Sequence, residues 1–230
     1  MKGLATGRMG VGVIGDEPSG IVVARALGAA GHAVIARTLP REDRLDMVEV
    51  HLGSVPVVER AVAVSRSELV LLAVSSDDLQ GVIDDLTTEG AWQAGHVVVH
   101  LSPDHGLDVL RPATEKGAIG IRLFPLMAFT GTSLDLHNLK ESWCMVSAPT
   151  PVLPIAQALA IEIGAEPTVL DDRFHREFSA GVAEATRVAE DSVRRAVGQL
   201  MQAGLENPKR AAASLLRSSV ERALADGLGE

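Results

Sequence analysis

The stretch Gly10-Val11-Gly12-Val13-Ile14-Gly15-Asp16-Glu17-Pro18-Ser19-Gly20 opens the part of the sequence that decides the fold. Its β-branched run stops at a glycine, and the segment 21–30 then carries small and aliphatic residues at steps of three and four. A second apolar run, 33–38, begins just after Gly31. A strand, a tight turn, a helix and a parallel strand in this order are typical of the first βαβ unit of a dinucleotide-binding sheet.

Strand-like and helix-like segments alternate as far as residue 170. The apolar runs 69–74 and 96–101 are predicted to be strands that are covered on both faces of a parallel sheet. Further strands are expected at 118–124, 143–147 and 167–170. This alternation predicts an α/β fold with an open, mostly parallel sheet in residues 1–170.

The pattern changes at Asp171. Apolar residues recur at steps of three and four over 174–200, which predicts one apolar stripe along a helix that ends at Gly204. Asn207-Pro208 then begins a second amphipathic helix. Two helices cannot enclose a core of their own. We therefore expect residues 171–230 to form a small helical domain whose stripe packs on the sheet domain, on a second subunit, or on both.

The composition excludes several classes of protein. The 230 residues are 47% hydrophobic, enough for a sizeable core, and the net charge of -9 without a basic stripe argues against a nucleic-acid partner. Cys144 is the single cysteine, which excludes an intrachain disulfide and fits a reducing cytoplasm. The sequence shows no signal peptide and no run long enough to span a membrane, so a cytoplasmic protein is expected. Without any tyrosine, reductases that use its hydroxyl as proton donor are excluded.

The turn after the first strand has two of the three glycines of the dinucleotide fingerprint. Gly15 and Gly20 stand first and third, but Glu17 takes the middle position, where glycine lets the backbone approach the pyrophosphate. Like charges about 4 Å apart repel by roughly 4 kcal/mol at a protein surface. A helix N-terminus attracts an anion by only about 0.3 to 2 kcal/mol. If Asp16 and Glu17 point at the phosphates, binding is therefore weak or lost. A working site with its acids turned to solvent and a vestigial site both fit the sequence.

The other candidate cofactor residues follow strands. The second strand ends in Arg37 where an acid would bond the ribose of NAD, and an arginine suits the 2′-phosphate of NADP. The alternative is an ordinary surface arginine. We expect NADP, held by the turn and by two strand ends: Gly15, Asp16, Glu17, Pro18, Ser19, Gly20, Arg37, Thr38, Val74 and Ser75.

Polar residues just past strand ends are the candidates for contact with nicotinamide and substrate: Ser75, Ser102, Asp104 and His105. Capping a helix is the alternative role for Ser75 and Ser102. His100 and His105 lack a third ligand at a recognisable spacing, so no metal site is predicted, and His100 is expected to be buried in its strand. His175, early in the long helix, is either a general acid for carbonyl reduction or a solvated helix residue.

Five segments carry a resemblance to a known family: Val13 to Gly20, Leu69 to Asp78, Val99 to Ser102, Leu123 to Gly131 and Arg173 to His175. The chain resembles the Rossmann-like proteins of the 6-phosphogluconate dehydrogenase and ketopantoate reductase superfamily. It looks closest to a bacterial branch with a helical C-terminal domain of unknown function. The resemblance implies an NADP-type cofactor, a substrate cleft against the long helix, and a homodimer formed through the helical part.

The sequence departs from this family in several respects: Glu17 and Pro103 replace glycines, Phe124 replaces a histidine, Ala183 or Glu184 replaces an asparagine, and the C-terminal domain is short. Only Ser102 and His175 carry over as catalytic residues. The expected function is that of an NADP-dependent dehydrogenase or reductase acting on a small carbonyl compound or hydroxy acid, with hydride passing over Ser102 and His175 carrying the proton. The alternative is a non-catalytic binding or regulatory protein that kept the fold and lost the cofactor.

Overall fold

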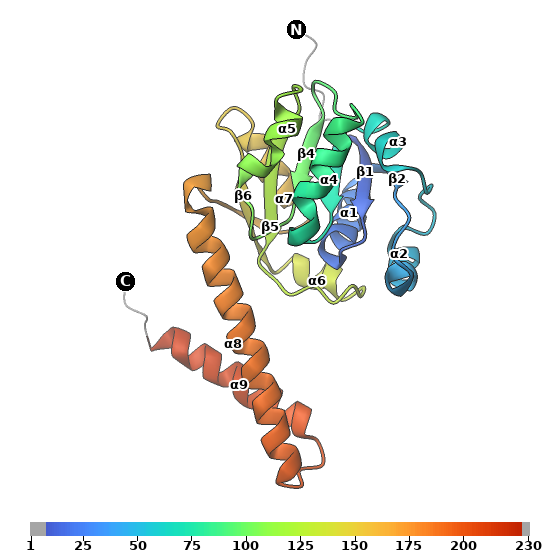
Figure 1. Ribbon diagram of the computed structural model, residues 1–230. Coiled ribbons are helices and arrows are strands. Elements are labelled where there is room, and N and C mark those ends of the chain that lie inside the picture. The colour runs from blue at the N-terminus through green and yellow to red at the C-terminus, as the bar shows by residue number, and fades with distance from the viewer. Residues whose placement is uncertain (1–7, 227–230) are drawn as a thin grey trace. The chain divides into compact units, whose positions relative to one another are not determined.

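The computed structural model describes residues 8–226 (Figure 1). The chain divides into two compact units, with the boundary between Arg176 and Glu177. The first unit is an α/β domain, and the second is made of helices. None of the helices in residues 8–226 is long and apolar enough to cross a membrane.

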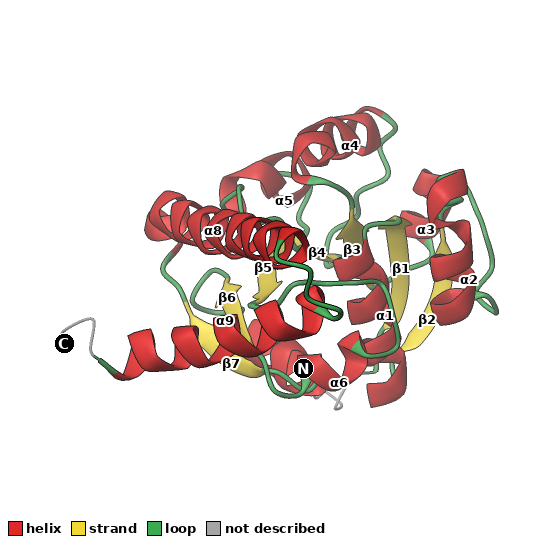
Figure 2. Cartoon of the chain, turned by 90° about the horizontal axis from the view of Figure 1, so that it is seen from below, coloured by secondary structure: helices red, strands yellow, loops and turns green. Residues whose placement is uncertain are grey.

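The described residues of the first unit form a seven-stranded sheet of order β2-β1-β3-β4-β5-β6-β7, which Figure 2 shows strand by strand. Neighbouring strands are parallel, except that β5 and β6 are antiparallel. The strands are β1 (Gly10–Gly15), β2 (Ala33–Arg37), β3 (Leu69–Ala73), β4 (Val97–His100), β5 (Ile119–Pro125), β6 (Trp143–Ser147) and β7 (Glu166–Val169). The prediction of an α/β fold with a mostly parallel sheet is confirmed.

Helices connect the strands on both faces of the sheet. They are α1 (Pro18–Ala30), α2 (Leu45–Leu52), α3 (Arg60–Ser65), α4 (Ser76–Thr88), α5 (Arg111–Thr114), α6 (Asp135–Leu139) and α7 (Leu153–Glu162). Short 3-10 helices are η1 (Glu42–Arg44), η2 (Leu107–Leu110) and η3 (Asp172–Phe174).

The core lies in two layers because successive side chains of a strand point to opposite faces. In β3, Leu69 and Leu71 join the layer formed with α1, α2 and α7. Val70 and Leu72 join the layer formed with α3, α4 and α5. Every residue of β3 is buried, which explains its uninterrupted apolar sequence.

The short helix α6 has no counterpart in the sequence prediction. Its five residues are too few to show a helical period. The fully buried carboxylate of Asp135 holds the preceding loop by accepting hydrogen bonds from the backbone N–H groups of Thr130 and Gly131, both at 2.8 Å. A tertiary contact of this kind leaves no periodic signal in the sequence.

The helices α8 (His175–Gln202) and α9 (Pro208–Ala225) make up the C-terminal region. The first of them contains no buried residue. Its apolar stripe is therefore accessible, and Val193 on that stripe is 47% exposed. The expected helical segment is present, and its apolar side chains remain available for packing.

Candidate functional site

Two glycines shape the turn between β1 and α1. Gly15 has a φ angle of +99°, and a Cβ at this position would lie 2.2 Å from the carbonyl oxygen of Ala73. A Cβ on Gly20 would lie 2.2 Å from the Cβ of Ala73. Helix α1 therefore packs directly against the end of β3, which is the role of the first and third glycines in a dinucleotide-binding turn.

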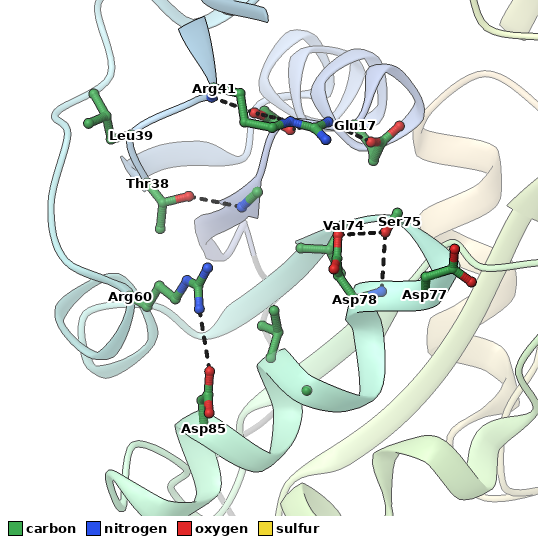
Figure 3. Close-up of a pocket in the computed structure, with 14 residues that line it drawn as sticks. Glu17, Thr38, Leu39, Arg41, Arg60, Val74, Ser75, Asp77, Asp78 and Asp85 are labelled. Carbon is green, nitrogen blue, oxygen red and sulfur yellow. Dashed lines mark hydrogen bonds and ion pairs between the residues drawn. The ribbon is translucent and has the colours of Figure 1, made fainter.

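The acids of this turn bind an arginine that the sequence analysis missed. Asp16 Oδ2 accepts a hydrogen bond from the backbone N–H of Arg41 at 2.6 Å, and Asp16 Oδ1 lies 2.9 Å from Arg41 Nη2. The same nitrogen donates to Glu17 Oε1 at 2.7 Å (Figure 3). Hydrogen bonds to Glu17 and then to Asp16 raise the pKa of Arg41 further above its ordinary value. Arg41 thus offsets one of the two negative charges and directs both carboxylates toward itself.

The end of β2 supports the turn through Thr38 and not through Arg37. Thr38 Oγ1 accepts a hydrogen bond from the backbone N–H of Gly15 at 2.9 Å. Arg37 is 3% exposed, and its guanidinium pairs with Glu49 and donates from Nε to the carbonyl of Val55 at 3.3 Å. The Arg37 side chain is therefore committed to α2 and to the segment before α3.

A cavity of about 460 Å³ lies beside the turn (Figure 3). It is bounded by the ends of β1 and β2 and by the first turns of α4. The residues that line this cavity include six of those predicted to bind the cofactor: Gly15, Asp16, Glu17, Thr38, Val74 and Ser75. Its charged lining consists of two arginines and five acids: Arg41, Arg60, Asp16, Glu17, Asp77, Asp78 and Asp85. The cavity is consequently acidic overall.

A second cavity, of about 410 Å³, adjoins the first because both are lined by Glu17, Val74 and Ser75. The other residues that line it are Pro18, Ser19, Arg44, Ser76, Leu101, Ser102, Pro103, Phe124 and Phe129. The predicted cofactor residues thus all line one of the two cavities except Gly20 and Arg37. The sequence analysis did not predict Ser76, Arg44 or Phe129 as site residues, although Ser76 and Phe129 lie in segments that carry the family resemblance.

The serines that follow β3 and β4 have different roles. Ser75 caps α4, since its hydroxyl oxygen accepts a hydrogen bond from the backbone N–H of Asp78 at 3.1 Å. Ser102 is 5% exposed and lies 2.8 Å from Ser76 Oγ and 3.1 Å from His105 Nδ1. Ser102 does not cap a helix, so its hydroxyl belongs to the wall of the second cavity.

Arg122 holds this wall from within the sheet. It is fully buried and donates to the carbonyl of Ser102 at 3.3 Å and to the carbonyl of Pro103 at 2.8 Å. Its Nη1 lies 3.9 Å from Asp172 Oδ1. Burial lowers the pKa of Arg122, and the charge of Asp172 opposes this effect. Arg122 thus fixes the backbone of the turn that carries the Ser102 hydroxyl.

His175 and Cys144 lie away from both cavities. His175 Nδ1 donates to the carbonyl of Asp172 at 2.9 Å, and Asp172 Oδ2 accepts from the backbone N–H of Leu107 at 2.8 Å. His175 therefore packs near the turn after Ser102 and lines neither cavity. Burial raises the pKa of the Cys144 thiol to about 12, as expected of a core residue that takes no part in chemistry.

His100 is fully buried, as predicted for a histidine within a strand, and it makes stability depend on pH. Burial, followed by the charges of Arg122 and His105, lowers the pKa of His100 to about 3. The unfolded chain binds a proton at this residue below about pH 6.5, whereas the folded chain does not. We therefore expect the free energy of unfolding to fall by up to about 1.4 kcal/mol per pH unit as the pH drops below 6.5 toward 3.

Urea denaturation of the wild type and of His100→Asn between pH 7.5 and pH 4 measures this contribution. Asparagine can still accept the hydrogen bond that the backbone N–H of Ser102 donates to His100 Nδ1 at 3.3 Å. The variant should show a shallower loss of stability with falling pH. Equal slopes for the two proteins would contradict the role given to His100.

Comparison with known proteins places the chain in a family. Residues 1–125 match the model of the Rossmann-like domain, and no curated protein matches the sequence. Among solved structures, an imine reductase from Pseudomonas sp. is 16% identical with a TM-score of 0.72, over 96% of this chain and 75% of that one.

Pyrroline carboxylate reductases have a similar fold. The enzyme from Plasmodium falciparum, solved with NADP bound, is 10% identical with a TM-score of 0.65, over 96% of this chain and 84% of that one. The enzyme from Streptococcus pyogenes is 13% identical with a TM-score of 0.67, over 96% of this chain and 82% of that one. The family match covers more than half of the sequence. The chain therefore belongs to the Rossmann-like domain family.

Proposed function

We propose that the protein is an NADP-dependent oxidoreductase that acts on a small carbonyl compound, imine or hydroxy acid. One observation carries the proposal: two adjoining cavities run along the carboxyl edge of the parallel sheet, from the glycine turn to Ser102. Ligands of such sheets bind at this edge. The NADP bound to the similar structure from Plasmodium falciparum supports the same cofactor class. When bound, a nicotinamide cofactor supplies or removes a hydride.

The residues of the turn fit the pyrophosphate of a dinucleotide. Helix α1 begins at Pro18, so the backbone N–H groups of Ser19 and Gly20 have no carbonyl partner within the helix. The carboxylate of Glu17 is turned to Arg41 and gives no side-chain cap to the helix. Arg41 and Arg60 are the cations of the first cavity, and we assign to them the contact with the 2′-phosphate that the sequence analysis assigned to Arg37.

Replacing Glu17 by glycine should tighten the binding of NADPH. The first cavity holds more carboxylates than guanidinium groups, so removing one negative charge should reduce the repulsion of a bound phosphate. Two unit charges about 8 Å apart repel by roughly 2 kcal/mol at a protein surface, which corresponds to about thirtyfold in Kd. Fluorescence titration with NADPH measures the change. Glu17→Gln separates charge from backbone freedom, and Glu115→Gln, at an exposed and distant position, should leave the Kd unchanged.

The same titration tests the second candidate, a non-catalytic protein with a degenerate cofactor site. The five acids of the first cavity favour this alternative, because they oppose any phosphate. Binding that appears only in Glu17→Gly would support it. If neither protein bound NADPH or NADP⁺ at millimolar concentration, the oxidoreductase proposal would be wrong.

We further propose that the protein is a cytoplasmic homodimer. The apolar stripe of α8 is accessible along the helix, and a second copy of the chain would remove it from water. Light scattering should give twice the mass of one chain, and Val193→Asp should give a monomer. A monomeric wild type at micromolar concentration would contradict the dimer.

A further inference from the structure

The proposed function gives no role to a cluster of side chains around Ser102. Ser102 Oγ lies 2.8 Å from Ser76 Oγ and 3.1 Å from His105 Nδ1. It also accepts a hydrogen bond from the backbone N–H of Asp104 at 3.1 Å. Ser76 and Ser102 line the second cavity, whereas His105 is half-buried and lies outside its lining. The cluster therefore connects the cavity wall to an imidazole that is partly open to solvent.

The hydrogen-bonding capacity of Ser102 couples the two ends of this cluster. A serine hydroxyl has one proton to donate and two lone pairs. The backbone N–H of Asp104 occupies one lone pair, so Ser102 donates to one of its other two partners and accepts from the other. When His105 Nδ1 carries a proton, Ser102 accepts from it and donates to Ser76. When Nδ1 is bare, Ser102 donates to it and accepts from Ser76.

The two arrangements present different groups to the cavity. In the first, Ser76 accepts from Ser102 and its own proton is free to be donated to a ligand. In the second, Ser76 has given its proton to the bond with Ser102 and can only accept from a ligand. The state of His105 thus decides whether the cavity wall offers a proton or receives one.

We propose that His105, Ser102 and Ser76 form a proton relay between solvent and the substrate bound in the second cavity. This inference rests on the proposed function. Reduction of a C=O or C=N bond adds a hydride to the carbon and leaves the oxygen or nitrogen in need of one proton. Ser76 Oγ gives that proton, Ser102 replaces it, and His105 Nδ1–H replaces the proton of Ser102. His105 becomes neutral and regains a proton from water, and oxidation runs the same steps in reverse.

Neighbouring titratable groups are placed differently from His105. The charged and titratable side chains near His105 and Ser102 include His100, Asp104, Arg122, Asp172 and His175. At the Ser76 end, Asp77 and Asp78 follow in α4, and Glu17 and Arg44 line the second cavity. His100 Nδ1 accepts from the backbone N–H of Ser102, and with its pKa lowered to about 3 the ring is neutral near neutral pH, so it has no imidazolium proton to give. His175 Nδ1 is bonded to a backbone carbonyl and lines neither cavity. His105 bonds the Ser102 hydroxyl directly and replaces His175 as the proton carrier.

Imidazole ¹⁵N NMR tests the relay without cofactor or substrate. The two arrangements correspond to the two tautomers of neutral His105. Without the Ser76 hydroxyl, Ser102 can still donate to a bare Nδ1, but it has no acceptor when Nδ1 carries the proton. Removal of the Ser76 hydroxyl should therefore favour the Nε2–H tautomer. The loss of one hydrogen bond should shift the tautomer ratio by roughly threefold to tenfold. Ser76→Ala and Ser76→Val should both do so, since valine also excludes a replacing water. An unchanged ratio in both variants would overturn the relay.

Two controls identify the path of the effect. Ser65 is an exposed serine that donates to the carbonyl of Val62, and Ser65→Ala should leave the His105 tautomers unchanged. In a Ser102→Ala background, adding Ser76→Ala should have no further effect, because Ser102 is the connecting group. A full effect of Ser76→Ala in that background would mean that the coupling does not pass through Ser102.

Catalysis supplies the second readout. Turnover is measured with NADPH and a panel of small ketones, keto acids and cyclic imines. His105→Ala should lower kcat by about 10² to 10⁴ and leave the Kd for NADPH unchanged. Added imidazole should restore part of the rate. His137→Ala removes a histidine whose side chain is 70% exposed and serves as the matched control. Absent NADPH binding by the wild type would refute the proposed function. Turnover that His105→Ala leaves unchanged would refute the relay alone.

Discussion

Arg122→Met should lower the free energy of unfolding by about 3 to 5 kcal/mol. Arg122 is fully buried, and methionine fills part of its volume without replacing its donors. The carbonyl groups of Ser102 and Pro103 would then lose their hydrogen bonds, at about 1 to 3 kcal/mol for each group left buried. Asp172 would also lose the neighbouring positive charge.

Chemical denaturation of the wild type, Arg122→Met and Arg111→Met measures this effect. Arg111 is a matched control because its side chain is 78% exposed and lies 4.0 Å from Glu115 in a surface pair. Its replacement should change stability by less than about 1 kcal/mol. A loss of similar size in both variants would show that Arg122 does not hold the wall of the second cavity.

Gly20→Ala should destabilise the protein by roughly 3 kcal/mol, although alanine is normally better than glycine within a helix by about 1 kcal/mol. The added Cβ would lie 2.2 Å from the Cβ of Ala73 and 2.7 Å from its Cα, so helix α1 would have to move away from β3. That movement displaces the turn on which cofactor binding depends. Thermal or urea unfolding measures the loss of stability, and NADPH titration measures the effect on cofactor binding.

Gly81→Ala gives the opposite expectation at a matched position. Gly81 also lies in a helix, α4, but a Cβ there would meet nothing within 4 Å. This substitution should stabilise the protein by up to about 1 kcal/mol. Combining Gly20→Ala with Ala73→Gly should recover part of the lost stability, because it removes one of the two colliding carbons. No recovery would mean that the contact with the Ala73 side chain is not the cause.

The regular elements of the sheet domain were predictable from the sequence because their signals are local. The apolar run that became β3 and the stripe of α4 show the periods of a buried strand and an amphipathic helix. The positions of Gly15 and Gly20 were informative because only glycine fits there: an added Cβ would lie 2.2 Å from the carbonyl oxygen or the Cβ of Ala73. Helix α6 was not predictable, since its five residues show no period and the buried carboxylate of Asp135 fixes the loop before it by a tertiary contact.

The candidate site was only partly predictable. Most residues of the turn and of the strand ends do line the two cavities, because parallel strands bring their carboxyl ends to one edge. Arg37 was expected there because it ends β2, yet its side chain is buried against Glu49 of α2. Which face a residue at a strand end presents depends on the helix that packs beside it, and one sequence does not show that packing.

By itself, the sequence determined the α/β fold, the order of strand, turn and helix at the start of the chain, and the edge of the sheet along which the two cavities lie. Each of these follows from side-chain periodicity and from the steric demands of glycine. Only the tertiary structure decided that Arg41 meets Asp16 and Glu17, and that His105, Ser102 and Ser76 form one hydrogen-bonded group. The contact between Ser102 and His105 is local, but the others join side chains that lie at least 24 residues apart. The partners in those contacts are determined by distance in the folded chain, which no spacing in the sequence encodes.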